Sequence, residues 1–360
     1  MNILILGGYG ATGRLLARHL LAETNHRIII AGRNLEKARG FVDSLHDSRA
    51  TAAQVDATDP ASLRQALRRV DLILVAAPTT HHAATVVRAA LDAGVDYLDV
   101  QYSDLKLEVL RAHEREINEK KLCFVTEAGY HPGLPSAMIR YAASKLDTIE
   151  SARVAGYLNM GNLPYTEAVD ELMEGFIHYQ AEIFKNGAWT RPSSWEMRTF
   201  DFGDEIGRRT CYSMFFEELR CLPEMYPTLR NTGFYISGSN LLADLILTPI
   251  IMLGLKLAPR RGIRPLGKLM WWGMNKSRPP YRVVLKAEAT GRLNGRQAQV
   301  EARIEHEDGY ELTAIPVVAF LLQYNQIRRP GLHMMGHLAE PDRLFNDMEG
   351  MGVRVTTTIR

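Results

Sequence analysis

The sequence lacks an excess of charge of either sign. Its 360 residues include 43 lysines and arginines and 41 aspartates and glutamates, mixed along the chain, so the formal net charge is only +2. Without a polybasic face there is no indication of nucleic-acid binding. Internal repeats and low-complexity tracts are also missing. A content of 46% hydrophobic and 23% charged residues is typical of a globular protein, and the length favours two lobes with separate cores.

Cysteine is scarce. Cys123, Cys211 and Cys221 are odd in number and far apart, which fits neither a disulfide framework nor a zinc-ligand spacing. A reducing compartment fits this usage, so we expect a cytoplasmic protein. The first strand is expected to begin at Asn2 or Ile3. Because this leaves no room for a charged, cleavable leader, we expect an unprocessed intracellular chain.

A hydrophobic run long enough to cross a membrane is absent too. Residues 240–257 are nearly all apolar, but a spanning helix needs about 20 such residues, and this run contains Asp244, Pro249 and Lys256. Basic residues and two tryptophans follow it. Three interpretations of residues 240–272 stay open: a buried helix, an oligomer contact, or peripheral membrane or lipid contact with basic and tryptophan anchors.

What the chain does have, at its start, is a glycine turn between a strand and a helix. Residues 3–6 are an apolar strand, and Gly8-x-Gly10-x-x-Gly13 follows directly. In a βαβ unit such glycines make the tight turn, admit a pyrophosphate against bare backbone and let the helix pack on the strand. The phosphates would meet the amide groups at the helix N-terminus. We predict a dinucleotide site whose pyrophosphate is bound by Gly8, Tyr9, Gly10, Ala11, Thr12 and Gly13.

The end of the second strand predicts which dinucleotide binds. An NAD-binding unit places an acidic side chain about 20 residues beyond the last glycine, on the ribose 2′-hydroxyl. Here Arg33 occupies that position, followed by Asn34. A guanidinium is a planar donor suited to a phosphate, so we predict NADP(H), with Arg33 and Asn34 on its 2′-phosphate. A solvated arginine that opens the next helix is the alternative.

Short apolar strands alternate with amphipathic helices up to about residue 146, an order typical of a doubly wound parallel sheet buried on both faces. Six strands are expected, because residues 51–55, 71–75, 97–100 and 122–125 follow the first two. Ligands in such sheets lie at the carboxyl ends of the strands. We therefore expect Asp56 and Ala57 at the adenine edge, and Ala77 and Pro78 along the nicotinamide ribose.

From residue 147 the pattern changes to longer alternating stretches, at 150–159, 281–293 and 297–306, which indicate antiparallel strands. Asn294-Gly295 between the last two predicts a hairpin, since both positions tolerate positive φ. We expect an α/β Rossmann domain at 1–146 and an inserted α+β domain at 147–309, mainly an antiparallel sheet with helices, for substrate binding and dimerisation.

The C-terminal segment, 310–360, is expected to return to the Rossmann domain and pack on it. Its pattern predicts a helix at 310–323, a second helix near 341–349 and a final strand at 352–357.

The loop after the sixth strand and two earlier motifs resemble a known family. Val125 to Pro135 (VTEAGYHPGLP), Tyr97-Leu98-Asp99-Val100 and the opening glycine turn are similar to the saccharopine dehydrogenase family. That family includes saccharopine reductases, related carboxyspermidine-forming enzymes and lipid-acting enoyl reductases. The resemblance covers about the first 145 residues, and only the overall plan beyond them. Members with amino-acid substrates often have an aspartate before the Pro-Gly, where this chain has His131, so the substrate stays open.

The resemblance implies hydride transfer between the nicotinamide C4 and a trigonal carbon, with the protein supplying orientation and a proton. His131 is the first candidate for the proton donor, because its ordinary pKa is about 6.5 and its loop is expected over the nicotinamide. A loop histidine bonded to backbone is the alternative. Tyr102, Tyr130 and Asp99 share this crevice and could bind substrate or hold the loop.

Two further motifs are interpreted as structural. Tyr141-x-x-x-Lys145 matches the catalytic pair of short-chain dehydrogenases, but Ala128 stands where that family has a serine, so we expect a plain amphipathic helix. His333 and His337 have the spacing of helical metal ligands, yet neighbouring proline and glycine argue against a helix there. We expect no metal.

Together these features predict an NADP(H)-dependent oxidoreductase of the saccharopine dehydrogenase type, acting on an imine, amino-acid-like or carbonyl carbon. One alternative is a membrane- or lipid-associated enoyl or keto reductase of the same fold, motivated by residues 240–272. Another is a non-catalytic NADP-binding protein, since no unambiguous acid–base pair is present. The predicted partners are a small-molecule substrate and a second copy of the chain, with no nucleic acid.

Overall fold

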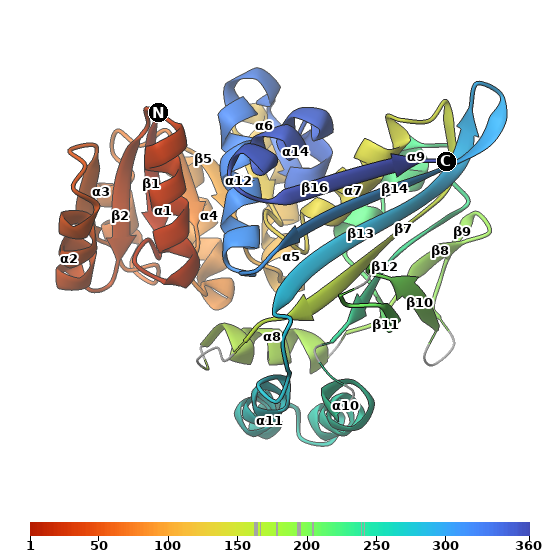
Figure 1. The fold of residues 1–360 in the computed structure, drawn as a ribbon. Helices are drawn as coiled ribbons and strands as arrows, with labels where there is room; N and C mark the ends of the chain where they lie inside the picture. Colours follow the sequence, from red (N-terminus) through yellow and green to blue (C-terminus); the bar gives the residue numbers. More distant parts are fainter. Residues whose placement is uncertain are drawn as a thin grey trace. The chain divides into compact units, whose positions relative to one another are not determined.

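The computed structural model describes residues 1–161, 165, 167–177, 179–192, 196–203, 205–238, 240 and 242–360. The chain divides into two compact units (Figure 1). The first unit is Met1–Leu134 with Thr313–Met351, and the second unit is Pro135–Leu312 with Gly352–Arg360. The second unit thus begins earlier than residue 147, and the end of the chain belongs to it.

The first unit is built on a seven-stranded sheet in the order β15-β6-β5-β4-β1-β2-β3, with all neighbouring strands parallel. Its strands are β1 (Asn2–Leu6), β2 (Arg27–Gly32), β3 (Ala50–Gln54), β4 (Leu72–Val75), β5 (Asp96–Asp99), β6 (Cys123–Thr126) and β15 (Gly331–Met334). Its helices are α1 (Ala11–Glu23), α2 (Leu35–Leu45), α3 (Pro60–Ala66), α4 (Ala83–Ala93), α5 (Asp104–Ala112), α6 (Glu114–Glu119), α12 (Glu311–Ile327), α13 (Met335–Leu338) and α14 (Pro341–Gly350), with the short 3-10 turn η1 (Thr80–His82).

The predicted doubly wound fold is confirmed, because the central strands are buried on both faces. Every residue of β4 is fully buried, and so are Ile3, Leu4 and Ile5 of β1. The seventh strand, β15, was not predicted. It has only four residues, pairs with β6 alone at the sheet edge, and follows Pro330, so it carries little alternating pattern.

A buried carboxylate fastens α12 to this sheet. Asp96, at the start of β5, accepts hydrogen bonds from Arg328 Nε (2.6 Å), Tyr324 OH (2.9 Å) and the backbone N–H of Cys123 (2.8 Å). Asp96 is 6% exposed, so its charge needs these partners. Helix α12 is therefore an integral part of the first unit.

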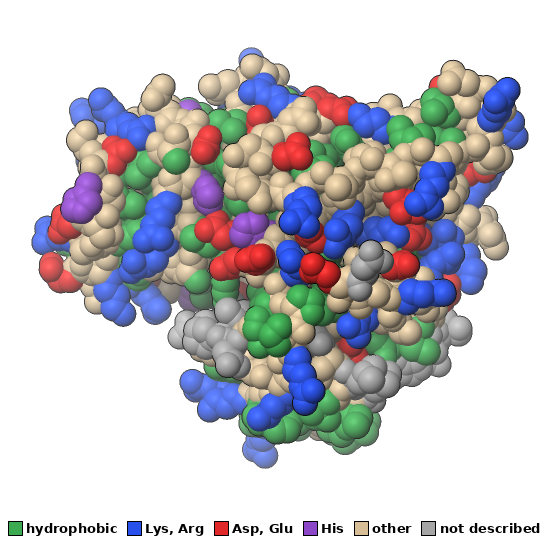
Figure 2. Space-filling view, in the orientation of Figure 1, with side chains coloured by type: hydrophobic (Ala, Val, Ile, Leu, Met, Phe, Trp, Pro, Cys, Tyr) green, Lys and Arg blue, Asp and Glu red, His purple; other side chains and the backbone are tan. Residues whose placement is uncertain are grey.

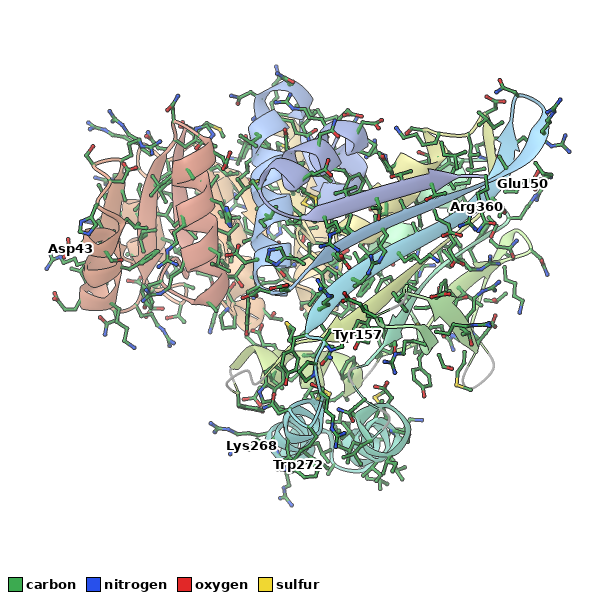
Figure 3. All side chains as sticks on the ribbon, in the orientation of Figure 1. Asp43, Glu150, Tyr157, Lys268, Trp272 and Arg360 are labelled. Carbon is green, nitrogen blue, oxygen red and sulfur yellow. The ribbon has the colours of Figure 1, made fainter. Side chains whose placement is uncertain are left out.

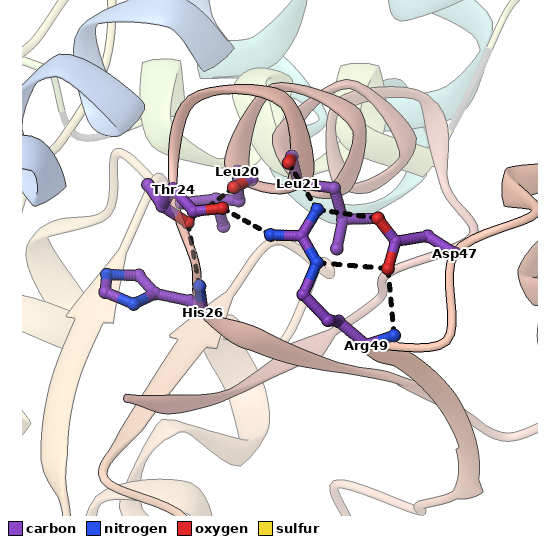
Figure 4. A network of polar contacts seen from close by, with 6 residues as sticks. All are labelled: Leu20, Leu21, Thr24, His26, Asp47 and Arg49. Atoms are coloured by element: carbon purple, nitrogen blue, oxygen red, sulfur yellow. Dashed lines mark hydrogen bonds and ion pairs between the residues drawn. The ribbon is translucent and has the colours of Figure 1, made fainter.

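Arg49, which directly precedes the edge strand β3, binds the C-terminal end of α1 (Figure 4). The Arg49 guanidinium donates to the carbonyl oxygens of Leu21 (2.6 Å) and Thr24 at the end of α1, and to both carboxylate oxygens of Asp47. A cation is favourable at a helix C-terminus because the last carbonyl groups have no partners within the helix. The arginine also holds the pKa of Asp47 below its usual range. The start of β3 is thereby tied to the end of α1.

The second unit is built on a nine-stranded mixed sheet whose main path is β10-β11-β12-β7-β13-β14-β16, with β8 paired to β12 and β9. Its strands are β7 (Thr148–Asn159), β8 (Ile183–Lys185), β9 (Ala188–Thr190), β10 (Met197–Asp201), β11 (Arg208–Met214), β12 (Asn231–Ser237), β13 (Arg282–Leu293), β14 (Arg296–His306) and β16 (Arg354–Ile359). Its helices are α7 (Leu134–Ala143), α8 (Glu167–Ile177), η2 (Glu217–Leu219), α9 (Leu222–Met225), the π-helix η3 (Leu242–Leu247), α10 (Thr248–Leu257) and α11 (Pro259–Met274).

The mainly antiparallel sheet was predicted, and its hairpin is where the sequence placed it. Asn294 and Gly295 have φ of 51° and 75° between β13 and β14. The final strand belongs to the sheet of the second unit, whereas it was expected with the Rossmann domain. It is β16, which pairs antiparallel with β14, because β14 offers an unpaired edge and Arg354 reaches Glu305 across it at 2.6 Å.

Replacing Arg328 by methionine tests the buried carboxylate. The substitution leaves Asp96 with only two neutral donors, so we expect the free energy of unfolding to fall by about 2–3 kcal/mol in urea titrations. Arg329→Met is the matched control, since this neighbouring arginine is exposed and makes no side-chain ion pair within the described residues. Equal losses in the two variants would mean that the Asp96 pair does not stabilise the unit.

Candidate functional site

The glycine turn lies between β1 and α1 and is pinned to the neighbouring strand. The backbone N–H of Gly7 donates to Ala31 O of β2 at 2.8 Å, and that of Gly10 donates to Gly7 O at 2.9 Å. Gly7 has φ of +86°, a conformation that L side chains rarely adopt. The turn is therefore fixed before any ligand arrives.

Two glycines of the motif have different tasks. A side chain at Gly13 would collide with Gly7 O and Gly8 Cα, so Gly13 is what lets α1 lie close against β1. At Gly10 an added Cβ would meet only Gly7 O, at 3.1 Å, and is otherwise in open space. The missing side chain at Gly10 thus leaves room above the turn, as a bound pyrophosphate requires.

The N-terminus of α1 offers backbone amides to that open space. Gly10 is the N-cap and has no side chain to cap with, and the first turn contains no acidic residue. The first bond of the helix runs from Arg14 N to Gly10 O at 3.0 Å, so the amides of Ala11, Thr12 and Gly13 precede it. Such amides, together with the helix dipole, favour an anion. These residues therefore fit the phosphates of a dinucleotide.

The residues predicted for the 2′-phosphate lie beside this turn. The Tyr9 hydroxyl accepts from Asn34 N at 3.1 Å, and the Tyr9 ring lies over Gly32. Arg33 is exposed at the end of β2 and makes no side-chain hydrogen bond or ion pair in the described part of the chain. The Asn34 side-chain oxygen accepts from Lys37 N at 2.9 Å as the N-cap of α2, so only its amide nitrogen is left for a ligand.

The remaining cofactor candidates follow β3 and β4, the strands expected to carry them. Asp56 accepts from Thr58 N and Oγ1, and these bonds hold its pKa below the usual range. Ala57 is partly buried beside it. After β4, Ala77 lies against Gly7, where an added Cβ would come within 2.8 Å of it. Ala77 therefore borders the turn and Pro78 follows it in sequence, whereas Asp56 and Ala57 follow β3.

Asp99 is engaged in a buried ion pair. Lys106 Nζ donates to Asp99 Oδ1 at 2.5 Å and to Gln101 O, while Thr126 Oγ1 donates to Asp99 Oδ2 at 3.0 Å. The side chains of both charged residues are at most 1% exposed. The pair joins the end of β5 to α5 and β6. Sequence reasoning missed Lys106, because a lysine in the first turn of a helix is normally solvated.

The loop after β6 is tightly folded. Ala128 N donates to Asp99 O at 3.0 Å. Gly133 has φ of +121°, and an added Cβ would lie within 2.7 Å of the backbone of Gly129. Within the loop, the rings of Tyr130 and His131 have centroids 4.1 Å apart. The strand ends thus bring Asp99, Tyr130 and His131 to one edge of the sheet, with Tyr102 three residues after β5.

The titration of the two loop residues follows from their surroundings. Burial raises the pKa of Tyr130 above its ordinary value. Burial lowers the pKa of His131 to about 4, and a backbone hydrogen bond opposes this only in part. The His131 imidazole is therefore neutral near pH 7, whereas the sequence argument used its unperturbed value of about 6.5.

The Tyr141-x-x-x-Lys145 motif and the His333 and His337 pair were interpreted as structural. Lys145 Nζ lies 4.5 Å from the centroid of the Tyr141 ring, and Tyr141 OH is 3.1 Å from Thr357 Oγ1 of β16. His333 lies on β15 and His337 on α13. No group of three or more potential metal ligands is found where the structure is described.

Comparison with known proteins shows which proteins this chain is similar to. Residues 3–125 match the family described as saccharopine dehydrogenase NADP binding domain. The chain is 30% identical over 169 residues to the NADP(+), L-glutamate-forming saccharopine dehydrogenase of Schizosaccharomyces pombe, which covers 46% of this chain and 35% of that enzyme. It is 24% identical over 253 residues to carboxyaminopropylagmatine dehydrogenase of Synechocystis, covering 66% of this chain and 63% of that one.

The chain thus spans about a third of the first relative and under two thirds of the second. Among solved structures, the apo saccharopine dehydrogenase (L-Glu forming) of Saccharomyces cerevisiae matches with a TM-score of 0.69 at 14% identity, covering 99% of both chains. This likeness shows a common fold for both units.

The matched segment contains β1 to β6, the glycine turn and Arg33. The match of residues 3–125 to the saccharopine dehydrogenase NADP-binding domain confirms over this segment both the resemblance seen in the sequence and the predicted cofactor, NADP.

Proposed function

We propose that the chain is an NADP(H)-dependent oxidoreductase of the saccharopine dehydrogenase type, acting on an imine, amino-acid-like or carbonyl carbon. The observation that carries the proposal is the pairing of an uncapped helix N-terminus at Gly10 with an exposed Arg33 at the end of β2. When bound, the nicotinamide cofactor supplies or accepts the hydride. The similarity to an L-glutamate-forming saccharopine dehydrogenase and to a carboxyaminopropylagmatine dehydrogenase supports the reaction class.

Each cofactor residue has a role set by its geometry. The amides of Ala11, Thr12 and Gly13 bind the pyrophosphate, Arg33 binds the 2′-phosphate, and Asn34 adds one amide donor. Gly8 and Tyr9 shape the turn: Tyr9 accepts from Arg14 Nε through its carbonyl oxygen at 2.8 Å and from Asn34 through its hydroxyl. Asp56 and Ala57 border the adenine, and Ala77 and Pro78 border the nicotinamide ribose.

Asp99 acts as a positioning residue rather than as an acid or base. Its two carboxylate oxygens bind Lys106 and Thr126, so it fixes the loop that carries Tyr130 and His131. Burial keeps the Tyr130 phenol protonated, as a hydrogen-bond donor must be. Tyr102 lies on the loop before α5, and we assign it to substrate binding.

His131 lies at the substrate side of the site in this proposal. A neutral imidazole has a free lone pair for a proton, so we assign His131 the role of base in substrate oxidation, although its lowered pKa makes it a weak one. To protonate the product in the reverse direction it must first be charged, and a carboxylate on the substrate would raise its pKa.

Two alternatives share the fold. A lipid-associated enoyl or keto reductase is favoured by the exposed apolar side chains of residues 246–272. A non-catalytic NADP-binding protein would keep the cofactor site without turnover. We also propose a cytoplasmic homodimer, and the three free cysteines support a reducing compartment.

Substitution of Arg33 tests the cofactor choice. In Arg33→Ala, NADPH should bind about 1.5–3 kcal/mol more weakly, the range for hydrogen bonds to charged groups, while NADH is nearly unaffected. Titration calorimetry measures both. Arg39→Ala is the control, because Arg39 is an exposed arginine of α2 that pairs only with Glu36 in the described residues. Equal losses of NADPH and NADH affinity would contradict the assigned role.

The lowered pKa of His131 predicts an acid-sensitive fold. Its value is about 4 in the folded chain and about 6.5 when unfolded, so protons bind preferentially to the unfolded state between these limits. Stability should therefore fall as the pH drops from 6.5 towards 4, by up to about 1.4 kcal/mol per pH unit from this group.

His131→Gln should flatten that slope in urea titrations at pH 7 and pH 5, while His81→Gln, at an exposed histidine, should not. An unchanged slope in His131→Gln would show that the imidazole is solvated in the folded protein.

Turnover separates the enzyme from the non-catalytic alternative. Steady NADPH oxidation is expected with an imine or carbonyl substrate, and Gly10→Asp should abolish it by placing a carboxylate where the pyrophosphate lies. Gly350→Asp is the control, since a Cβ there meets nothing within 4 Å. If NADPH binds but imines, ketones and enoyl compounds all fail to support its oxidation, the chain is the non-catalytic NADP-binding protein and not an enzyme.

A further inference from the structure

The second unit carries an exposed apolar helix face. Eleven large apolar side chains are exposed in the described residues, and five of them lie between 246 and 272. On η3 and α10 these are Ile246, Ile250, Leu253 and Leu257, with exposures of 53%, 51%, 59% and 78%. Their spacing of four, three and four residues places them on one side of a continuous helix.

The opposite side of the same helices is packed. Leu247, Ile251 and Leu255 form a cluster with Met173 of α8, and Ile263 and Leu266 of α11 pack against it. Asn240 Nδ2 donates to Gly273 O at 2.9 Å, which joins the start of η3 to the end of α11. Helices α10 and α11 therefore pack against each other and against α8. The exposed apolar side chains of η3 and α10 are not part of an incompletely packed core.

The outer side of α11 is cationic. Arg260, Arg264, Lys268 and Trp272 follow one another at four-residue spacing, and all four are exposed. Figure 3 shows Lys268 and Trp272 pointing away from the sheet of the second unit. Lys276 Nζ lies 5.3 Å from the Trp272 ring. Hydrophobic and basic side chains gather side by side over these helices in Figure 2.

Acidic residues are missing from the whole stretch. Residues 245–287 contain nine lysines and arginines and not one aspartate or glutamate, although the chain as a whole is nearly neutral. Asp244, just before it, is largely buried, and burial raises its pKa to about 6. A tryptophan beside basic residues and an apolar face is the arrangement of helices that lie in a membrane interface.

We propose that the α10–α11 hairpin, residues 246–272, docks on the surface of an anionic lipid membrane. Leu253 and Leu257 enter the acyl boundary, Trp272 lies at the headgroup level, and Arg260, Arg264 and Lys268 bind lipid phosphates. The chain rests on the surface, because no described helix is long and apolar enough to cross a bilayer. A second copy of this face is a poor partner, since residues 246–272 contain no acidic side chain that could pair with the cationic row.

Vesicle flotation tests the proposal with the full-length protein. Phosphatidylcholine vesicles containing phosphatidylglycerol should bind the protein at low salt, and pure phosphatidylcholine vesicles should bind it much less. Arg264→Glu with Lys268→Glu should weaken binding at least about tenfold, as loss of two phosphate contacts predicts. Leu253→Ser with Leu257→Ser should do the same. Arg64→Glu with Arg68→Glu, two exposed cations four residues apart in the first unit, is the matched control.

Two readouts keep the outcome distinct from the cofactor proposal. Each variant must keep the circular dichroism spectrum and the thermal unfolding of the parent, which shows that it is folded. Trp emission should shift to the blue with anionic vesicles, and Trp272→Phe should reduce that shift. Absence of binding to anionic vesicles, or equal weakening in the control, overturns the proposal. So does dissociation of a dimer by Leu253→Ser with Leu257→Ser without vesicles, which assigns the face to a second copy.

Discussion

The close approach of α1 to β1 is the constraint on which the candidate site depends. Only glycine at position 13 lets the helix begin against the backbone of Gly7 and Gly8, and this approach aims the first amides of α1 at the space left open by Gly10. β1 is also the central strand where the order reverses, with β2 on one side and β4 on the other. Crevices at such reversals are where doubly wound sheets bind their ligands. The ends of β2, β3 and β4 supply the remaining candidate residues around this one contact.

The sequence predicted those features that depend on local chemistry. The glycine spacing, Arg33 and Asn294-Gly295 each require a particular backbone conformation or charge at a fixed distance along the chain, and all lie where expected. Long-range pairings were not predictable in the same way. Lys106 meets Asp99, and Arg328 meets Asp96, through the packing of elements whose order in space no single-sequence pattern states. The same is true of β15 and β16, whose sheets became evident only from the pairing.

Burial explains why the His131 loop and residues 240–257 could not be fully interpreted from the sequence. From the sequence, a histidine before Pro-Gly is expected to have a pKa near neutrality. Burial lowers the pKa of His131, and the motif itself gives no sign of that burial. Conversely, residues 240–257 read as a buried helix as readily as an interfacial one, because periodicity alone does not say which face is covered. In the structure one side of this helix packs in the cluster around Ile251, and the side at Leu253 is exposed.

The return of the chain to the first sheet affects how the protein is made. β15 and α12 come from residues after 310, yet they complete the edge of a sheet that begins at residue 2. During synthesis the edge of β6 therefore has no β15 partner until residues 331–334 have left the ribosome. Exposed strand edges in such intermediates invite pairing with other chains. A fragment ending before Thr313 lacks both the partner of Asp96 and the edge strand, so the lobe is a product of the whole polypeptide rather than a module that folds first.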